Sequence, residues 1–321
     1  MRASLGHSWL LALALSIVAC SDDGASPADG ATAADQGAPV ADAAPLLPDA
    51  PVPDASGPVR VLFIRGGPGT GGFLEGGADG QLSDITDTST KPGNHGWAQL
   101  ADELRALGMV PEQRIEGPVS NNTPVALTAS LLARYRVVVF GSNNAAYPAA
   151  SVKALLDWVR AGGGALFISD ANWGSDWHDA SDSDQAFLDQ LDLKMNQDHG
   201  TYVRDTSHFA VPTHPVLAGV KSLDGEGVTP LTVTSNLPGV DPLVLVPAAG
   251  KVRRNTNTGQ GPLTDATAAD GAVVLLELGQ GRVAGHFDRN TFFNKGGAGT
   301  SIARLDNRRY ARNMFSWLAG K

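Results

Sequence analysis

Apolar residues beyond position 58 alternate between short continuous runs and stripes at helical spacing. The run VRVLFIRGG at 59–67 is rich in β-branched residues and stops at glycines, which predicts a strand buried on both faces. The segment 95–108 then places apolar residues at helical intervals and ends on a glycine, which predicts a helix. Further strands are expected from 135 and 165, with a helix from 149 between them. This alternation predicts an α/β fold in which helices cover both faces of a parallel sheet.

The second half of the chain has a different pattern. Residues 242–250 are expected to form a strand, and 271–287 a hairpin that turns at 279–281. The chain closes with an amphipathic helix whose apolar stripe, which we expect to be core, is formed by Tyr310, Met314, Phe315 and Leu318. Extra strands are therefore predicted beside the parallel sheet.

The first twenty residues form an export signal that ends on Cys20, the one cysteine of the chain. Their apolar run is shorter than the roughly 20 residues that span a membrane. The letters IVAC resemble the bacterial lipobox, in which the cysteine is lipid-modified and becomes the new N-terminus. We therefore expect a lipoprotein signal peptide at 1–19 and a diacylglyceryl- and palmitate-bearing membrane anchor at Cys20. A fold without a second cysteine forms no internal disulfide and has no thiol nucleophile.

Residues 20–58 are built mostly from Ala, Asp, Pro and Gly, which predicts a disordered tether. Residues 21–58 hold seven Asp and no Lys or Arg, so most of the net charge of −9 lies before the domain expected at 59–321. That domain is nearly neutral. Its balance of charge argues against nucleic acid as a partner and against a polybasic membrane-binding face.

Four stretches of this domain carry a family resemblance: GGGALFISDAN from 162, HPVLAGV from 214, GRVAGHFDRNTF from 281 and the closing NRRYARNMFSWLAG. In this order they resemble the ThuA-like (trehalose-utilisation) group of the class I glutamine amidotransferase-like superfamily. The resemblance implies a flavodoxin-like sheet and, loosely, sugar metabolism. Where that superfamily carries Cys or ThuA-like proteins carry His, this chain has Asp170. Because glutaminase chemistry needs a thiolate, we expect no amidotransferase activity.

Ligands of open parallel sheets collect beyond the carboxyl ends of the strands. Four loops are expected to meet there: 66–80, 141–147, 170–182 and 286–297. Tryptophan faces stack on sugar rings, and amides and backbone N–H groups pair with hydroxyls, which is the composition of a carbohydrate site. The alternative is that the tryptophans only pack at an edge of the core, which is the more common role of tryptophans in loops. The predicted ligand-binding residues are Gly66, Gly67, Asn143, Asn144, Asn172, Trp173, Trp177 and Asn290.

Two histidines and two carboxylates of these loops suggest catalysis. His286 and Asp288 are spaced to point to the same side of an extended chain, close to the expected elbow at Asp170 and to His178. Such a set could hold a divalent metal such as Zn²⁺ or Mn²⁺, or act as general acid and base without a metal. A purely structural, hydrogen-bonded role is the third alternative.

Other polar residues have simpler interpretations. Ser181 or Ser183 is expected to cap a helix beginning near 184. His199 and His208 lie in a segment without a clear period, expected to be an insertion over the sheet edge. His214 precedes a proline and is expected in a turn.

These residues and patterns suggest three functions. The first is a lipid-anchored cell-envelope protein that binds a carbohydrate or similar polyhydroxylated ligand, with or without turnover. The second is a metal- or carboxylate-dependent hydrolase. The third is a non-catalytic envelope scaffold that uses the sheet edge or segment 194–235.

Overall fold

The computed structural model describes residues 57–67, 82–91, 95–118, 121, 123–168, 180–197, 199–256, 260–295 and 300–321. Cys20, the signal peptide and the tether up to residue 56 lie outside these residues, and so do the five site residues predicted between 170 and 178.

The core of the fold is a nine-stranded sheet with strand order β2-β1-β3-β4-β13-β12-β8-β5, in which β9 also pairs with β12. Its parallel part contains β1 (Arg60–Arg65), β2 (Val110–Ile115), β3 (Val137–Ser142), β4 (Gly164–Ile168) and β13 (Gly281–His286). An order that begins 2-1-3-4 is the flavodoxin-like order, with β13 in the fifth place. The predicted α/β class and its parallel sheet are therefore confirmed.

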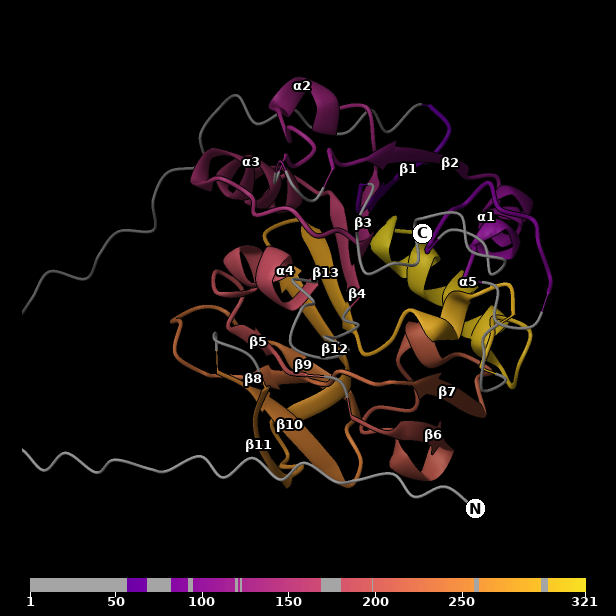
Figure 1. Ribbon diagram of the computed structural model, residues 1–321, viewed down its shortest axis with the longest axis vertical. Coiled ribbons are helices and arrows are strands. Elements are labelled where there is room, and N and C mark those ends of the chain that lie inside the picture. Colours follow the sequence, from indigo (N-terminus) through magenta and orange to yellow (C-terminus); the bar gives the residue numbers. More distant parts are fainter. Residues whose placement is uncertain are drawn as a thin grey trace, which may run out of the picture. The chain divides into compact units, whose positions relative to one another are not determined.

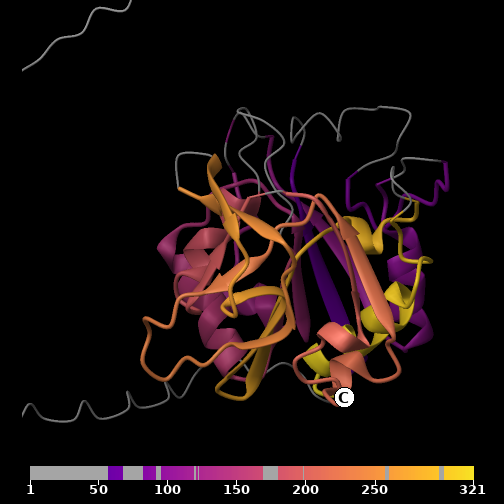
Figure 2. The ribbon, with the colours of Figure 1, turned by 90° about the horizontal axis from the view of Figure 1, so that it is seen from below.

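Helices cover both faces of this sheet (Figures 1 and 2). One face carries α1 (Ala98–Ala106) and α5 (Asn307–Leu318), whose apolar residues pack with Val61, Phe63 and Val139. The other carries α2 (Ala129–Leu132), α3 (Ala149–Arg160) and α4 (Ala180–Leu188), and packs against Leu62 and Phe140. The side chains of a strand alternate between faces, so two cores form on the same strands.

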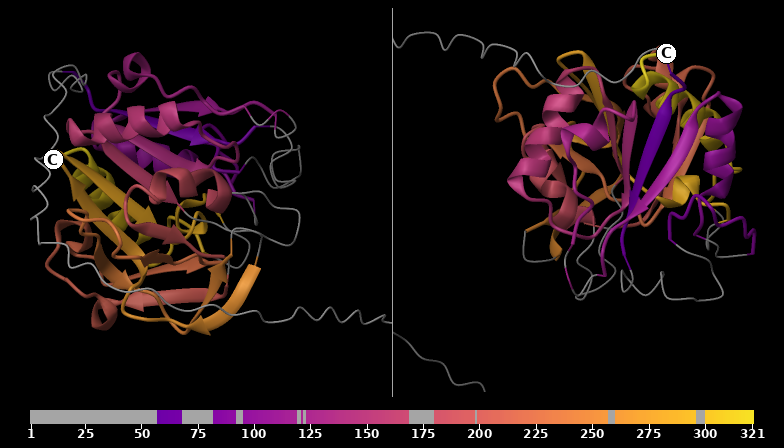
Figure 3. Two further views of the ribbon diagram at one scale, coloured as in Figure 1. Left: turned by 90° about the vertical axis from the view of Figure 1, so that its left-hand side faces the viewer. Right: turned by 90° about the horizontal axis from the view of Figure 1, so that it is seen from above.

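The C-terminal half adds the predicted extra strands. Strand β12 (Asp270–Leu278) turns at 279–280 into β13, which confirms the hairpin, and it pairs antiparallel with β8 (Leu231–Val233) and β9 (Leu243–Pro247). Strand β5 (Leu193–Met195) completes the edge beside β8. Two separate ribbons are formed by β6 (Thr201–Asp205) with β7 (Ser222–Glu226), and by β10 (Lys251–Asn255) with β11 (Gln260–Asp265), as Figure 3 shows from two further sides.

Most predicted elements are present, but two differ. The apolar stripe of α5 is fully buried, as expected. Helix α4 begins at Ala180, so Ser181 and Ser183 both lie inside it and the prediction that one of them caps the helix is wrong. The segment 194–235 is only partly an insertion, because β5 and β8 extend the main sheet. His214 accepts a hydrogen bond from the Val216 N–H at 3.2 Å and caps a short 3-10 helix, in agreement with the predicted turn role.

Candidate functional site

The carboxyl ends of β1, β3, β4 and β13 lie side by side because these strands are consecutive neighbours in the sheet. Between β1 and β3 the sheet changes winding direction, since α1 lies on one face and α3 on the other. Such a switch point is where open α/β sheets bind ligands. The loops predicted to meet at this edge therefore begin at the same place, although residues 68–80, 170–179 and 296–297 of these loops are outside the described part of the chain.

Asn143 follows β3 directly and is 1 % exposed. Its Nδ2 donates to Ser183 Oγ at 2.7 Å and to Asp184 Oδ1 at 2.5 Å, and the Ser183 hydroxyl donates back to the Asn143 carbonyl at 3.1 Å. These bonds fix the end of β3 to α4. Ser183, predicted as a cap, is instead a buried partner of a predicted ligand-binding residue.

Glu116 holds the same loop from the other side and was not predicted from the sequence. The carboxylate lies just after β2 and is 4 % exposed. Its Oε2 accepts the N–H groups of Asn144 at 2.7 Å and Ala145 at 3.0 Å, while its Oε1 accepts the Tyr147 hydroxyl at 2.7 Å. Burial raises the pKa of Glu116 despite these bonds. The loop 143–147 is thus positioned by polar groups from both of its neighbours.

Two buried atoms at this point have no partner. Ser142 Oγ and Asn143 Oδ1 are each inaccessible to solvent and make no hydrogen bond with the described residues. Buried polar atoms normally find a partner, and leaving one without costs about 1–3 kcal/mol. Both atoms lie at the carboxyl end of β3. The switch point therefore contains a neutral hydroxyl and a neutral amide oxygen that make no hydrogen bond with the described residues.

Arg65 ends β1 and was also missed from the sequence. Its Nη1 lies 2.5 Å from Asp84 Oδ2, and both residues are buried. Asp84 additionally accepts from the Thr86 N–H at 2.8 Å and the Gln113 amide at 3.2 Å. Burial lowers the pKa of Arg65, and hydrogen bonds to Asp84 from Thr86 hold the pKa of that carboxyl below its usual value against the effect of burial. The charge at the end of β1 is therefore paired internally.

Gly66 and Gly67, whose backbone N–H groups were predicted to bind a ligand, lie where the fold itself constrains them. The Gly66 N–H donates to the Ser142 carbonyl at 2.9 Å, so it is used in joining β1 to β3. At Gly67 an added Cβ would lie 2.0 Å from the Gly117 carbonyl oxygen, which makes this glycine a point of close approach between two chain segments. The structure therefore explains both glycines without a ligand.

His286 and Asp288 lie at the end of β13 and are both fully buried. Nδ1 of His286 lies 3.0 Å from the Tyr310 hydroxyl, and burial lowers the histidine pKa to about 3. Asp288 Oδ2 accepts the Glu226 N–H at 2.5 Å, and its Oδ1 accepts the Asn290 N–H at 2.8 Å. Asp288 thereby joins β7 to the short 3-10 helix that begins at Asn290.

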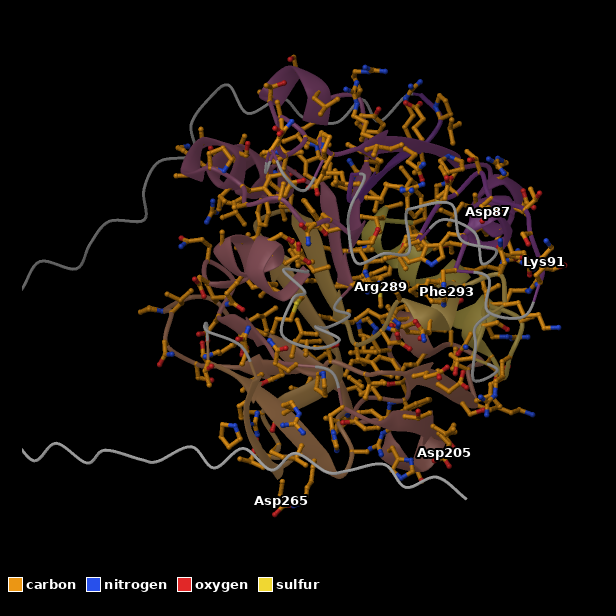
Figure 4. All side chains as sticks on the ribbon, in the orientation of Figure 1. Asp87, Lys91, Asp205, Asp265, Arg289 and Phe293 are labelled. Carbon is orange, nitrogen blue, oxygen red and sulfur yellow. The ribbon has the colours of Figure 1, made fainter. Side chains whose placement is uncertain are left out.

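Arg289, between Asp288 and Asn290 in the sequence, is 2 % exposed and lies with Phe293 near the middle of the molecule in Figure 4.

Among the described residues no group of three or more His, Cys, Asp or Glu side chains could hold a metal ion. Asp170 and His178, the other half of the predicted four-residue set, lie outside those residues, as do Asn172, Trp173 and Trp177. The metal and acid–base interpretations therefore stay predictions.

No protein-family model matches the chain, and no curated protein matches it. Several solved structures are similar to it. One is a protein named as ThuA-like from Bacteroides uniformis, with 14% identity over 82% of this chain and 93% of that one and a TM-score of 0.43. Another named as ThuA-like, from Parabacteroides merdae, has 14% identity over 83% and 91% and a TM-score of 0.41. A cytoplasmic protein from Salmonella typhimurium has 15% identity over 82% and 97% and a TM-score of 0.45.

Proposed function

We propose that the carboxyl edge of the parallel sheet, centred on the β1/β3 switch point, binds a carbohydrate or similar polyhydroxylated ligand. The observation that carries this proposal is the pair of buried, unpartnered atoms Ser142 Oγ and Asn143 Oδ1 at the end of β3. A hydroxyl that both donates and accepts, next to an amide oxygen that accepts, is complementary to the hydroxyl groups of a sugar.

The charges around this pair favour a neutral ligand. Arg65 is paired with Asp84, and the Glu116 carboxylate accepts three hydrogen bonds from the loop after β3. Glu116 positions the loop, and Arg65 and Asp84 neutralise each other. The two atoms left to contact a ligand, Ser142 Oγ and Asn143 Oδ1, are neutral. The next strand along the sheet is β4, and the loop that follows it carries Trp173 and Trp177, whose ring faces would supply the stacking surface that sugar sites use.

The test is binding of glucose, mannose and maltose to the wild type and to Ser142→Ala, measured by calorimetry and by thermal shift. Since the Ser142 hydroxyl has no partner in the described structure, its removal is expected to leave the melting temperature unchanged or raised. Loss of one ligand hydrogen bond is expected to weaken sugar binding by about tenfold. Ser316→Ala, on α5, serves as the control and should bind as the wild type does. Absence of saturable binding by the wild type, or equal binding by Ser142→Ala, would contradict the proposal.

We also propose that the protein is held at the cell envelope by lipid at Cys20. The support is the IVAC stretch and the absence of any other cysteine in the sequence. Within the described ranges the structure contains no helix that is both long and apolar enough to cross a membrane. Cys20→Ser should move the protein from the membrane to the soluble fraction and abolish incorporation of labelled palmitate. A variant that still sediments with membranes and is processed at the same position would contradict lipidation.

A further inference from the structure

A buried arginine lies outside the nine-stranded sheet, on the ribbon formed by β6 and β7. Arg204 is the fourth residue of β6 and is 9 % exposed. Figure 1 shows this ribbon at the margin of the molecule, and Figure 4 labels the next residue, Asp205, there. Arg204 lies on none of the strands that end at the proposed sugar site, so a ligand at Arg204 does not depend on sugar binding at the switch point.

The Arg204 guanidinium has no partner among the described residues. Its Nε is inaccessible to solvent and makes no hydrogen bond, and no carboxylate of those residues forms an ion pair with the side chain. Two other arginines show the contrast, because buried Arg65 lies 2.5 Å from Asp84 and half-buried Arg254 lies 2.5 Å from Asp270. Burial lowers the pKa of Arg204, as expected for a desolvated cation.

No described side chain around Arg204 forms an ion pair with it, and the charge of Asp205 opposes the effect of burial on its pKa only in part. Tyr202 is two residues earlier and therefore on the same face of β6, and its ring stacks on Phe287 with centroids 6.2 Å apart. Opposite Arg204 across the ribbon is Leu223, which is fully buried. Asp205 is on the other face of the strand, where its carboxylate accepts from the Ser207 N–H at 2.9 Å and lies 2.9 Å from His208 Nδ1.

A cation held in apolar surroundings without a counter-ion is costly, and proteins retain such an arrangement rarely. We propose that Arg204 is the recognition group of a second ligand site, which binds a carboxylate. A guanidinium presents parallel N–H groups that match the two oxygens of a carboxylate and pair with it in a bidentate manner. A carboxylate carries one negative charge, which the one guanidinium neutralises, whereas a phosphate carries more charge and usually recruits several donors.

The test compares sodium acetate, sodium glucuronate and sodium phosphate with sodium chloride at equal ionic strength, using the full chain and both thermal shift and calorimetry. Acetate represents a free small carboxylate, and glucuronate a carboxylate borne by a sugar. At least one of the two is expected to bind saturably and to raise the melting temperature relative to chloride. Arg204→Gln should weaken that binding by about tenfold or more, because a hydrogen-bonded charge pair is lost.

Two further measurements separate this site from a merely structural arginine. In chloride alone, Arg204→Gln is expected to melt at the same temperature as the wild type or higher, since an unpaired buried charge is removed. Arg309→Gln, which removes an exposed arginine of α5, should leave carboxylate binding unchanged and controls for general charge effects. The proposal is overturned if neither carboxylate binds saturably, if Arg204→Gln binds them as well as the wild type, or if phosphate alone binds.

Discussion

The hydroxyl of Tyr310 lies 3.0 Å from Nδ1 of His286, and the two fully buried rings join α5 to the end of β13. Burial lowers the pKa of this histidine to about 3. An imidazole in this position is neutral at physiological pH, and it contacts the Tyr310 hydroxyl where α5 packs on β13. For a proton-transfer role it would have to work far from its own pKa.

The His286–Tyr310 pair predicts how stability depends on pH. The unfolded histidine titrates near its usual pKa of about 6.5, while the folded one stays neutral down to about 3. Its contribution is fully present above the unfolded pKa and is lost as the pH falls toward the folded pKa, by up to about 1.4 kcal/mol per pH unit. Urea unfolding across this range should show the loss in the wild type and in Tyr310→Phe. In the double variant His286→Phe/Tyr310→Phe, the unfolding free energy should depend less steeply on pH, by the amount that corresponds to about one proton. An unchanged pH dependence would contradict the assignment.

Glu116 predicts a contrast between two substitutions. Glu116→Ala leaves the N–H groups of Asn144 and Ala145 and the Tyr147 hydroxyl without their acceptor and should cost about 3 kcal/mol of unfolding free energy. Glu116→Gln keeps an oxygen for the two N–H groups and an amide for the hydroxyl, and should cost less than about 1 kcal/mol. Since the folded pKa is raised, folding of the wild type takes up a proton, and the wild type should gain stability relative to Glu116→Gln as the pH falls toward the unfolded pKa. Equal losses in both variants would show that shape rather than hydrogen bonding matters.

Asp288→Asn, which keeps the shape of the side chain, is expected to lower the stability of the fold. Each oxygen accepts one backbone N–H, from Glu226 and from Asn290, and asparagine offers a single acceptor oxygen. Asp288→Asn should therefore lower the unfolding free energy by about 1–3 kcal/mol, measured by chemical denaturation. A variant as stable as the wild type that has lost a metal- or sugar-dependent thermal shift would instead place Asp288 in ligand chemistry.

Gly281 predicts the severest effect of a single methyl group. A Cβ added there would lie 1.9 Å from the Val159 carbonyl oxygen and 2.4 Å from that of Gly163, so α3 and β13 would have to separate. Gly281→Ala should cost about 3 kcal/mol or more. Gly239→Ala is the matched control, because nothing lies within 4 Å of its Cβ and only its positive φ of 76° is unfavourable. Its cost should be near 1 kcal/mol, and similar melting temperatures for the two variants would contradict the close approach.

Asp170→Asn tests the predicted role of Asp170 through a ligand-dependent difference in thermal stability. Asp170→Asn preserves shape and removes charge, so a ligand or general-base role implies that thermal shifts by divalent metals or by mono- and disaccharides are lost while the fold survives. A structural turn role implies a cost on the order of 1 kcal/mol with binding intact. The measurement is a thermal-shift panel on both proteins. No shift of the wild type, together with a lower melting temperature of the variant, would leave Asp170 as a turn residue.

The parallel sheet was predictable because β1, β3 and β4 are continuous apolar runs separated by helical stripes. Strand β2 was not, since this edge strand contains Pro111, Glu112 and Arg114 and has no apolar run. Glu116, which follows β2, was missed for the same reason. Its hydrogen-bond partners lie 28 to 31 residues further along the chain, so only the crossover between strands brings them together. Ser183, predicted as a helix cap, instead bonds with Asn143, and a partner 40 residues away leaves no local signal in the sequence.

The place of β13 has a consequence for how the chain folds. This strand lies between β4 and β12 in the interior of the sheet, and its register pairs Arg282 with Gly164 and His286 with Ile168. Until residues 281–286 have been synthesised, one side of β4 has no strand to pair with, and the edge that will become the middle of the sheet is open to other chains. Pairings between segments so distant in sequence form slowly. We therefore expect a chain truncated before Gly281 to aggregate rather than to fold as a smaller α/β domain.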